Sequence, residues 1–156
     1  MKKNIFMLLL TLALLASGCA GNAATSSTPA TGGERYDIST PEEYLASVRE
    51  HSLALQASLE QETLTQADMN MKSQELYELW DSALNYLWGE LKAALPEKEF
   101  AALQDEQRTW LAEKETAVKE TGKEVEGGSL YPLVINSASA QLTEVRVYEL
   151  FALLKE

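Results

Sequence analysis

Cysteine and histidine are almost absent from this sequence of 156 residues, which has one of each. A single cysteine excludes a disulfide within one chain and a metal site built from several thiolates. The only histidine, His51, has no second histidine at helical spacing and no HExxH pattern, so we interpret it as an exposed helix residue. The sequence also lacks a G-x-S-x-G motif and a phosphate-binding glycine loop. We therefore expect no enzyme activity, no cofactor, no metal and no small-molecule substrate.

Basic side chains are scarce as well. The chain has 13 Lys and Arg against 24 Asp and Glu, a formal net charge of −11. Nucleic acid is not expected as a partner, because a phosphate backbone is bound by clustered Lys and Arg. The summed field would instead attract a cationic protein. The alternative, that the acidity only keeps a secreted protein soluble, stays open.

The sole cysteine, Cys19, ends an apolar run near the start of the chain. Lys2 and Lys3 precede the apolar residues 5–15, and small residues 16–18 stand directly before Cys19. This pattern predicts a lipoprotein signal peptide and an acylated cysteine, and hence an extracytoplasmic protein on the cell membrane or outer membrane. A transmembrane anchor is the alternative, but the apolar run is about half of the roughly 20 residues that a spanning helix needs.

Composition changes divide the chain into three predicted parts. Residues 1–18 are the signal peptide, and residues 19–40 are the acylated cysteine and a linker. The linker contains NAATSSTPATGG, a small and polar sequence typical of a flexible tether. Residues 41–156 form the remaining part, which is long enough for one domain.

Capping motifs and apolar spacing predict four helices in this domain. Thr40, Pro41 and Glu43 form a helix start, and Thr65 and Asp68 repeat the capping pattern. Proline and glycine then separate the later helices. The expected helices span about 41–62, 66–95, 96–120 and 133–154. No run alternates as a strand does, so we predict an all-α, antiparallel bundle of about four helices.

Each helix carries an apolar stripe that predicts its buried face. Because Pro96 leaves only a short hinge, the second and third helices should fold back on each other as a hairpin. On the last helix we expect Val145, Tyr148 and Phe151 to widen the stripe. The main stripe there is Leu133, Asn136, Ala140, Thr143, Val147, Leu150 and Leu154.

Four polar residues interrupt these stripes: Asp81 and Asn85, Gln107, and Arg146. Polar groups are costly to bury unless they are partnered. We therefore expect Asp81 and Arg146 to offset each other's charge, with the Asn85 and Gln107 amides bonded nearby. The alternative to a functional role is that this network only fixes the register of the helices.

Four segments of the helical domain share their order with the motifs of a known family. They are DSALNYLW (81–88), LQDEQRTWLAEKE (103–115), GGSLYP (127–132) and QLTEVRVYEL (141–150). Together they resemble the LprI-like lysozyme-inhibitor family, over about residues 65–154. The resemblance implies a small helical extracytoplasmic domain, often a lipoprotein, that binds and inhibits lysozyme.

The same resemblance marks individual motif positions. Trp88 stands where the family has tyrosine, and Lys114 and Glu115 stand where an Arg-Asp pair is usual. Lysine keeps the charge of arginine but loses its planar, two-pronged hydrogen bonding. The motif positions are Leu84, Trp88, Trp110, Lys114, Glu115 and Thr143.

From this resemblance we form a hypothesis of function. Acidic helix faces would attract a basic lysozyme, and the loop of Gly127, Gly128, Ser129 and Tyr131 would enter its cleft. The alternative for the loop is a simple helix connection. The alternative for the protein is a non-inhibitory envelope scaffold or sensor that binds another surface protein or a cell-wall component.

Overall fold

Helices account for most of the residues that the computed structural model describes, 40–60 and 63–155. They are α1 (Pro41–Leu59), α2 (Gln66–Ala94), α3 (Glu97–Gly122), the 3-10 turn η1 (Lys123–Val125) and α4 (Tyr131–Leu153). No strand occurs in these two described ranges, and the predicted all-α bundle is confirmed. The predicted signal peptide, Cys19 and most of the linker lie outside the described residues. In the part that is described, no helix is both long and apolar enough to cross a membrane.

The predicted caps form at the starts of the first two helices. The Thr40 hydroxyl accepts the Glu43 N–H at 3.2 Å. At α2, the Asp68 N–H donates to Thr65 Oγ1 at 3.2 Å, and the Thr65 N–H donates to Asp68 Oδ2 at 3.0 Å. Each bond satisfies an N–H that the first helical turn leaves without a partner.

The other helix ends differ slightly from the prediction. Helix α1 ends at Leu59, short of the predicted end at residue 62, and residues 61 and 62 are outside the described ranges. Helix α4 begins at Tyr131, two residues early, because Pro132 fits the first turn, where its missing N–H is not needed. Helices α2 and α3 lie within two residues of their predicted bounds.

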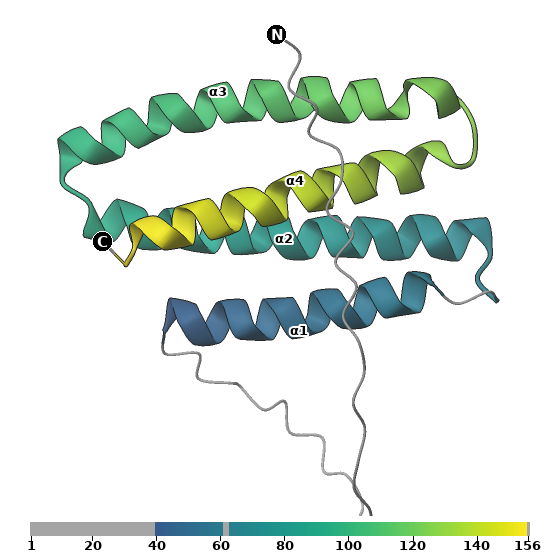
Figure 1. The fold of residues 1–156 in the computed structure, drawn as a ribbon, viewed down its shortest axis with the longest axis horizontal. Helices are drawn as coiled ribbons and strands as arrows, with labels where there is room; N and C mark the ends of the chain where they lie inside the picture. Colours follow the sequence, from purple (N-terminus) through teal and green to yellow (C-terminus); the bar gives the residue numbers. More distant parts are fainter. Residues whose placement is uncertain (1–39, 61–62, 156) are drawn as a thin grey trace, which may run out of the picture. The chain divides into compact units, whose positions relative to one another are not determined.

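Helix α4 occupies a central position in the bundle. From top to bottom, Figure 1 shows the helices in the order α3, α4, α2, α1. Helices that follow one another in the sequence run in opposite directions. The most extensive helix contact is between α2 and α4, which run parallel. Helix α3 packs against α4. The predicted hairpin of α2 and α3 is antiparallel, but its two helices have few close backbone contacts. A side-chain contact joins the rings of Trp88 and Phe100, whose centroids are 5.1 Å apart.

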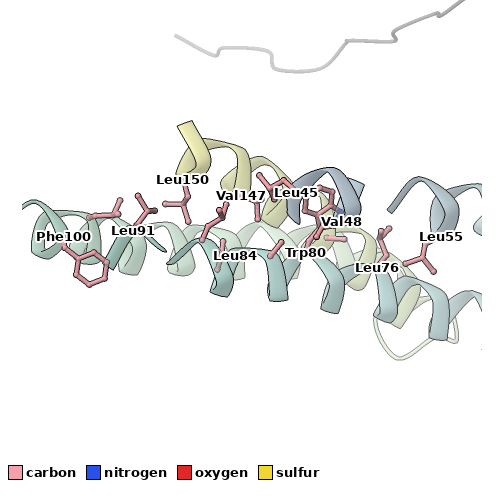
Figure 2. Packing of buried hydrophobic residues seen from close by; sticks show 14 residues of the cluster. Leu45, Val48, Leu55, Leu76, Trp80, Leu84, Leu91, Phe100, Val147 and Leu150 are labelled. Carbon is pink, nitrogen blue, oxygen red and sulfur yellow. The ribbon is translucent and has the colours of Figure 1, made fainter. Parts of the chain in front are cut away.

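The core follows the buried face of α2. Trp80, Leu87 and Leu91 on α2 and Val147 and Leu150 on α4 are fully buried. Figure 2 shows Trp80 beside Val48 of α1. At about 25 cal/mol per Å² of apolar surface removed from water, such side chains supply the main stabilisation of the bundle.

The expected widening of the α4 stripe is wrong for Val145, which is 55% exposed. Tyr148 is 39% exposed, but its ring centroid lies 5.9 Å from that of the buried Trp80. Phe151 is partly buried against the core. The reason for the exposure of Val145 is the position of α4: α2 and α3 cover two of its sides, and no described helix covers the side that carries Val145.

Helix α1 docks on α2 through the stripe that its sequence predicts. Leu45, Val48, Ser52 and Leu55 are buried. The Trp80 indole N–H donates to Ser52 Oγ at 3.1 Å, so the polar atom in this stripe serves a fully buried tryptophan. The rings of Tyr44 and Tyr86 are also in contact, with centroids 4.1 Å apart and planes tilted by 40°.

Candidate functional site

Arg146 is the centre of the buried polar cluster, and it links α4 to α3. Its side chain is 6% exposed. Its Nε donates to Gln107 Oε1 at 2.9 Å, and Gln107 is itself buried. Its Nη1 donates to Glu106 Oε1 at 2.8 Å and to Glu149 Oε2 at 3.0 Å. Both glutamates are more than half exposed, so water still solvates the charges that balance the guanidinium.

The expected pairing of Asp81 with Arg146 is wrong. The carboxylates within ion-pair distance of Arg146 in the described chain belong to Glu106 and Glu149. Asp81 instead accepts from Asn85 Nδ2, at 3.1 Å on its Oδ2 and 2.9 Å on its backbone oxygen. Asn85 is exposed, not buried as its stripe position suggests. The guanidinium extends toward α3, where Glu106 stands beside Gln107, and so it reaches no carboxylate on α2.

One nitrogen of this cluster has no hydrogen-bond partner in the described structure. Arg146 Nη2 is buried and unpaired, while Arg146 Cζ lies 5.9 Å from the Trp110 ring centroid, within the range of a cation–π contact. The geometry of the cluster is that of a cross-link between two helices.

The other family-motif residues divide into core and surface. Leu84 is buried. Thr143 is fully buried and donates its hydroxyl to the Ser139 carbonyl at 2.7 Å. Trp88 and Trp110 are partly buried against the core, and Glu115 is exposed.

Lys114 is the motif residue with the most unusual surroundings. It is partly buried, and its Nζ lies 4.6 Å from the centroid of the Tyr77 ring and 5.3 Å from that of Trp110. Burial lowers the pKa of Lys114, and the negative charge of Asp81 partly opposes this. The lysine lines an open cavity of about 640 Å³ between α2, α3 and α4.

The glycine-rich loop connects α3 to α4 at one end of the bundle. Gly127, Gly128 and Ser129 are exposed, and Gly127 has a φ of +77°, which few other residues adopt. The Asn70 side chain donates to the Ser129 carbonyl at 3.1 Å, which holds the loop to the start of α2. Tyr131 is partly buried and packs closely on Gly122, so it lies at the base of the loop.

The loop and the Arg146 cluster are separate places. At 1.5 Å per residue, Tyr131 and Arg146 are roughly 22 Å apart along α4. The predicted binding residues therefore form one region, and the predicted polar network is split between the Arg146 cluster and the Asp81–Asn85 pair.

Several residues that matter here were not singled out from the sequence. Glu149 follows Arg146 by three residues, a helical spacing that could have indicated the ion pair. Glu106, Tyr77 and Asn70 contact their partners across 40, 37 and 59 residues of chain. Nothing in one sequence places such distant residues together.

Within residues 40–60 and 63–155, no group of three or more His, Cys, Asp or Glu side chains is arranged to hold a metal ion. The fold and these sites define a small all-α bundle with a helix-linking polar cluster and an exposed glycine-rich loop. Residues 57–150 match the family model described as lysozyme inhibitor LprI, and the chain belongs to this family. The predicted resemblance to this family is thereby confirmed. Comparisons with curated proteins and with solved structures gave no match.

Proposed function

We propose that this protein binds lysozyme outside the cytoplasm and inhibits it, while lipid on Cys19 anchors the protein to a membrane. The observation that carries the proposal is the family match over residues 57–150, which includes α2, α3, the loop and most of α4. The chain acts by occupying the enzyme and performs no reaction of its own.

The glycine-rich loop is the contact region that we propose. Gly127, Gly128 and Ser129 are exposed, and Leu130 is 46% exposed. Ser129 would hydrogen-bond to the catalytic carboxylates of the enzyme, since glycoside hydrolases act with a pair of carboxyl groups in a cleft. Leu130 would supply an apolar anchor, because Tyr131 is partly buried at the base of the loop.

The contact between Asn70 and the loop supports this role. Asn70 holds the Ser129 carbonyl at 3.1 Å, which fixes the loop before a partner arrives. A segment that is already ordered loses less conformational entropy on binding, so more of the contact energy appears as affinity.

Charge supplies the long-range part of the mechanism. The chain has a formal net charge of −11, and a basic lysozyme would be drawn toward it. Salt screens this attraction over about 10 Å at 0.1 M ionic strength, so inhibition should weaken as salt rises.

An assay of lysozyme on dye-labelled, isolated cell walls tests the proposal. The full chain, purified in mild detergent, should slow the release of dye, and more so at low than at moderate salt. A Ser129→Ala, Leu130→Ala double variant should lose inhibition. Leu53→Ala, which removes an exposed leucine on α1, serves as the matched control and should retain it.

Absence of inhibition by an excess of the protein at either salt concentration would reject the proposal. If the same preparation then retained a surface protein or a wall fragment, the scaffold or sensor alternative would be favoured.

A further inference from the structure

The ammonium group of Lys114 has few partners for a charge that is partly withdrawn from water. No carboxylate in the described chain lies within ion-pair distance of it. Its hydrogen bond to Tyr77 Oη is 3.5 Å long. An ammonium group carries three N–H donors, so donors remain for a group that enters from the cavity.

The cavity beside Lys114 has the size and lining of a small-ligand site. Its volume is about 640 Å³, and ligand sites commonly measure roughly 300–1,000 Å³ with mostly apolar walls and a few polar groups. Tyr77, Leu111, Val118, Tyr131 and Ile135 form the apolar part of the wall.

The charged residues of the wall restrict what kind of anion can enter. Lys119 joins Lys114 on the positive side, and Glu115 and Glu126 line the same cavity. Besides these two lysines and two glutamates, the negative charge of Asp81 also acts on Lys114. The three carboxylates oppose a polyanion such as a phosphate ester. A single carboxylate can lie at Lys114 without a second negative charge near Glu115 or Glu126.

We propose that this cavity binds a small monocarboxylate with an apolar or ring-shaped body. The carboxylate accepts hydrogen bonds from Lys114 Nζ, and the body packs on Tyr77 and Tyr131. This ligand goes beyond the proposed contact with lysozyme, which uses the exposed loop. It also departs from the sequence analysis, which predicts no small-molecule substrate.

Such a carboxylate would also improve the surroundings of Lys114 itself. Burial lowers the pKa of the lysine, and a bound anion would favour its charged form. Perturbed titratable groups beside a cavity are a recognised mark of binding sites, and here the cavity and the two aromatic rings support the same assignment.

Calorimetric titration of the full chain with two acids and their neutral counterparts tests this proposal. The sugar acid is N-acetylmuramic acid, and N-acetylglucosamine is the same ring without the lactyl ether that carries the carboxylate. The other acid is 3-phenylpropionate, and 3-phenylpropionamide is its neutral analogue. At least one acid should bind with a Kd of about 1 mM or tighter, and about tenfold more tightly than its neutral counterpart. The acid that binds better tells whether the body is a sugar or an apolar ring.

Two pairs of variants locate the binding. Lys114→Met keeps the length of the side chain and removes the charge, and should weaken binding about tenfold. Lys98→Met removes an exposed lysine near the start of the same helix, away from the cavity, and should bind as the parent does. Ala112→Trp should block the cavity while keeping Lys114, and Ala117→Trp changes an exposed alanine that does not line it.

Three results would overturn the proposal. They are no saturable binding of either acid at about 10 mM, equal binding of acids and neutral counterparts, and unchanged binding in either Lys114→Met or Ala112→Trp when that variant is folded. The two substitutions act independently, so a folding defect in one leaves the other to decide.

Discussion

The Nε of Arg146 on α4 donates to Oε1 of Gln107 on α3 at 2.9 Å, and both side chains are buried. This bond and the one to Glu106 join α3 to α4 near the middle of both helices. We expect Arg146→Ala to destabilise the protein by about 3 kcal/mol, because it leaves the Gln107 amide unsatisfied and removes packing. Urea unfolding followed by circular dichroism at 222 nm measures the change.

A matched control exists on α3 itself. Arg108 pairs with Asp105 at 2.6 Å, but both side chains are more than 70% exposed. Arg108→Ala should change stability by less than about 0.5 kcal/mol. If Arg146→Ala and Arg108→Ala lowered the free energy of unfolding equally, the Arg146 cluster would not act as a cross-link between the helices.

Ser52→Ala should loosen α1. The substitution leaves the indole N–H of Trp80 buried without an acceptor, which costs about 1–3 kcal/mol. Because the bond joins α1 to α2, hydrogen exchange should accelerate in the amides of α1 more than in those of α2. Ser47→Ala, at an exposed position on the same helix, is the control. Unchanged exchange in α1 of the Ser52 variant would contradict the role of this bond.

Two glycines should respond to alanine in opposite directions. A Cβ on Gly122 would lie 2.8 Å from both Ile135 Cγ2 and Tyr131 Cε2, so Gly122→Ala should cost about 1–3 kcal/mol through overpacking. At Gly89 a Cβ would meet nothing within 4 Å, and Gly89→Ala should stabilise α2 by about 0.5–1 kcal/mol. Thermal unfolding of both variants measures the change in melting temperature. Changes of the same sign in both variants would refute this prediction.

The cap of α2 should make stability depend on pH. Hydrogen bonds from the Thr65 side chain and backbone hold the pKa of Asp68 below its ordinary value, with a smaller contribution from Lys72. The folded state thus favours the carboxylate. Its contribution is present above the unfolded pKa of about 4 and is lost as the pH falls through the folded value. Asp68→Asn should therefore be less stable than the parent at pH 6, with a difference that shrinks below about pH 4.

The Thr65→Val background provides the control for this pH effect. Thr65→Val removes the hydroxyl that donates to Asp68 Oδ2 at 2.6 Å. In this background, the stability difference that Asp68→Asn makes should therefore depend less on pH. A difference that stays constant from pH 6 to pH 2 would show that the cap does not shift the titration.

The helices could be predicted because residues close in sequence determine where each helix begins and ends. Thr40, Thr65 and Pro96 mark three starts, and the stripe from Leu45 to Leu55 identifies the face of α1 that is buried. These are local effects of capping and periodicity, which a single sequence carries.

The contacts of the site were harder to predict from the sequence because they depend on how the helices are placed along one another. Arg146 was expected to pair with Asp81, and it pairs with Glu106 because α4 is packed on α3 at that level. The exposure of Val145 has a related cause, since periodicity gives the apolar side of a helix but not which neighbours cover it. The stacking of Lys114 on Tyr77 spans 37 residues and leaves no local pattern.

Because α4 packs on both α2 and α3, the core cannot be completed during synthesis until α4 has been made. Residues 131–153 are made after the other described helices, yet Val147 and Leu150 fill the interior beside α2. Until they emerge, α1 covers only part of the apolar face of α2, and the parts of α2 and α3 that α4 covers in the folded protein would be exposed in a nascent or prematurely terminated chain. A stop codon ahead of residue 147 should consequently yield an aggregation-prone product, and not a shorter working protein.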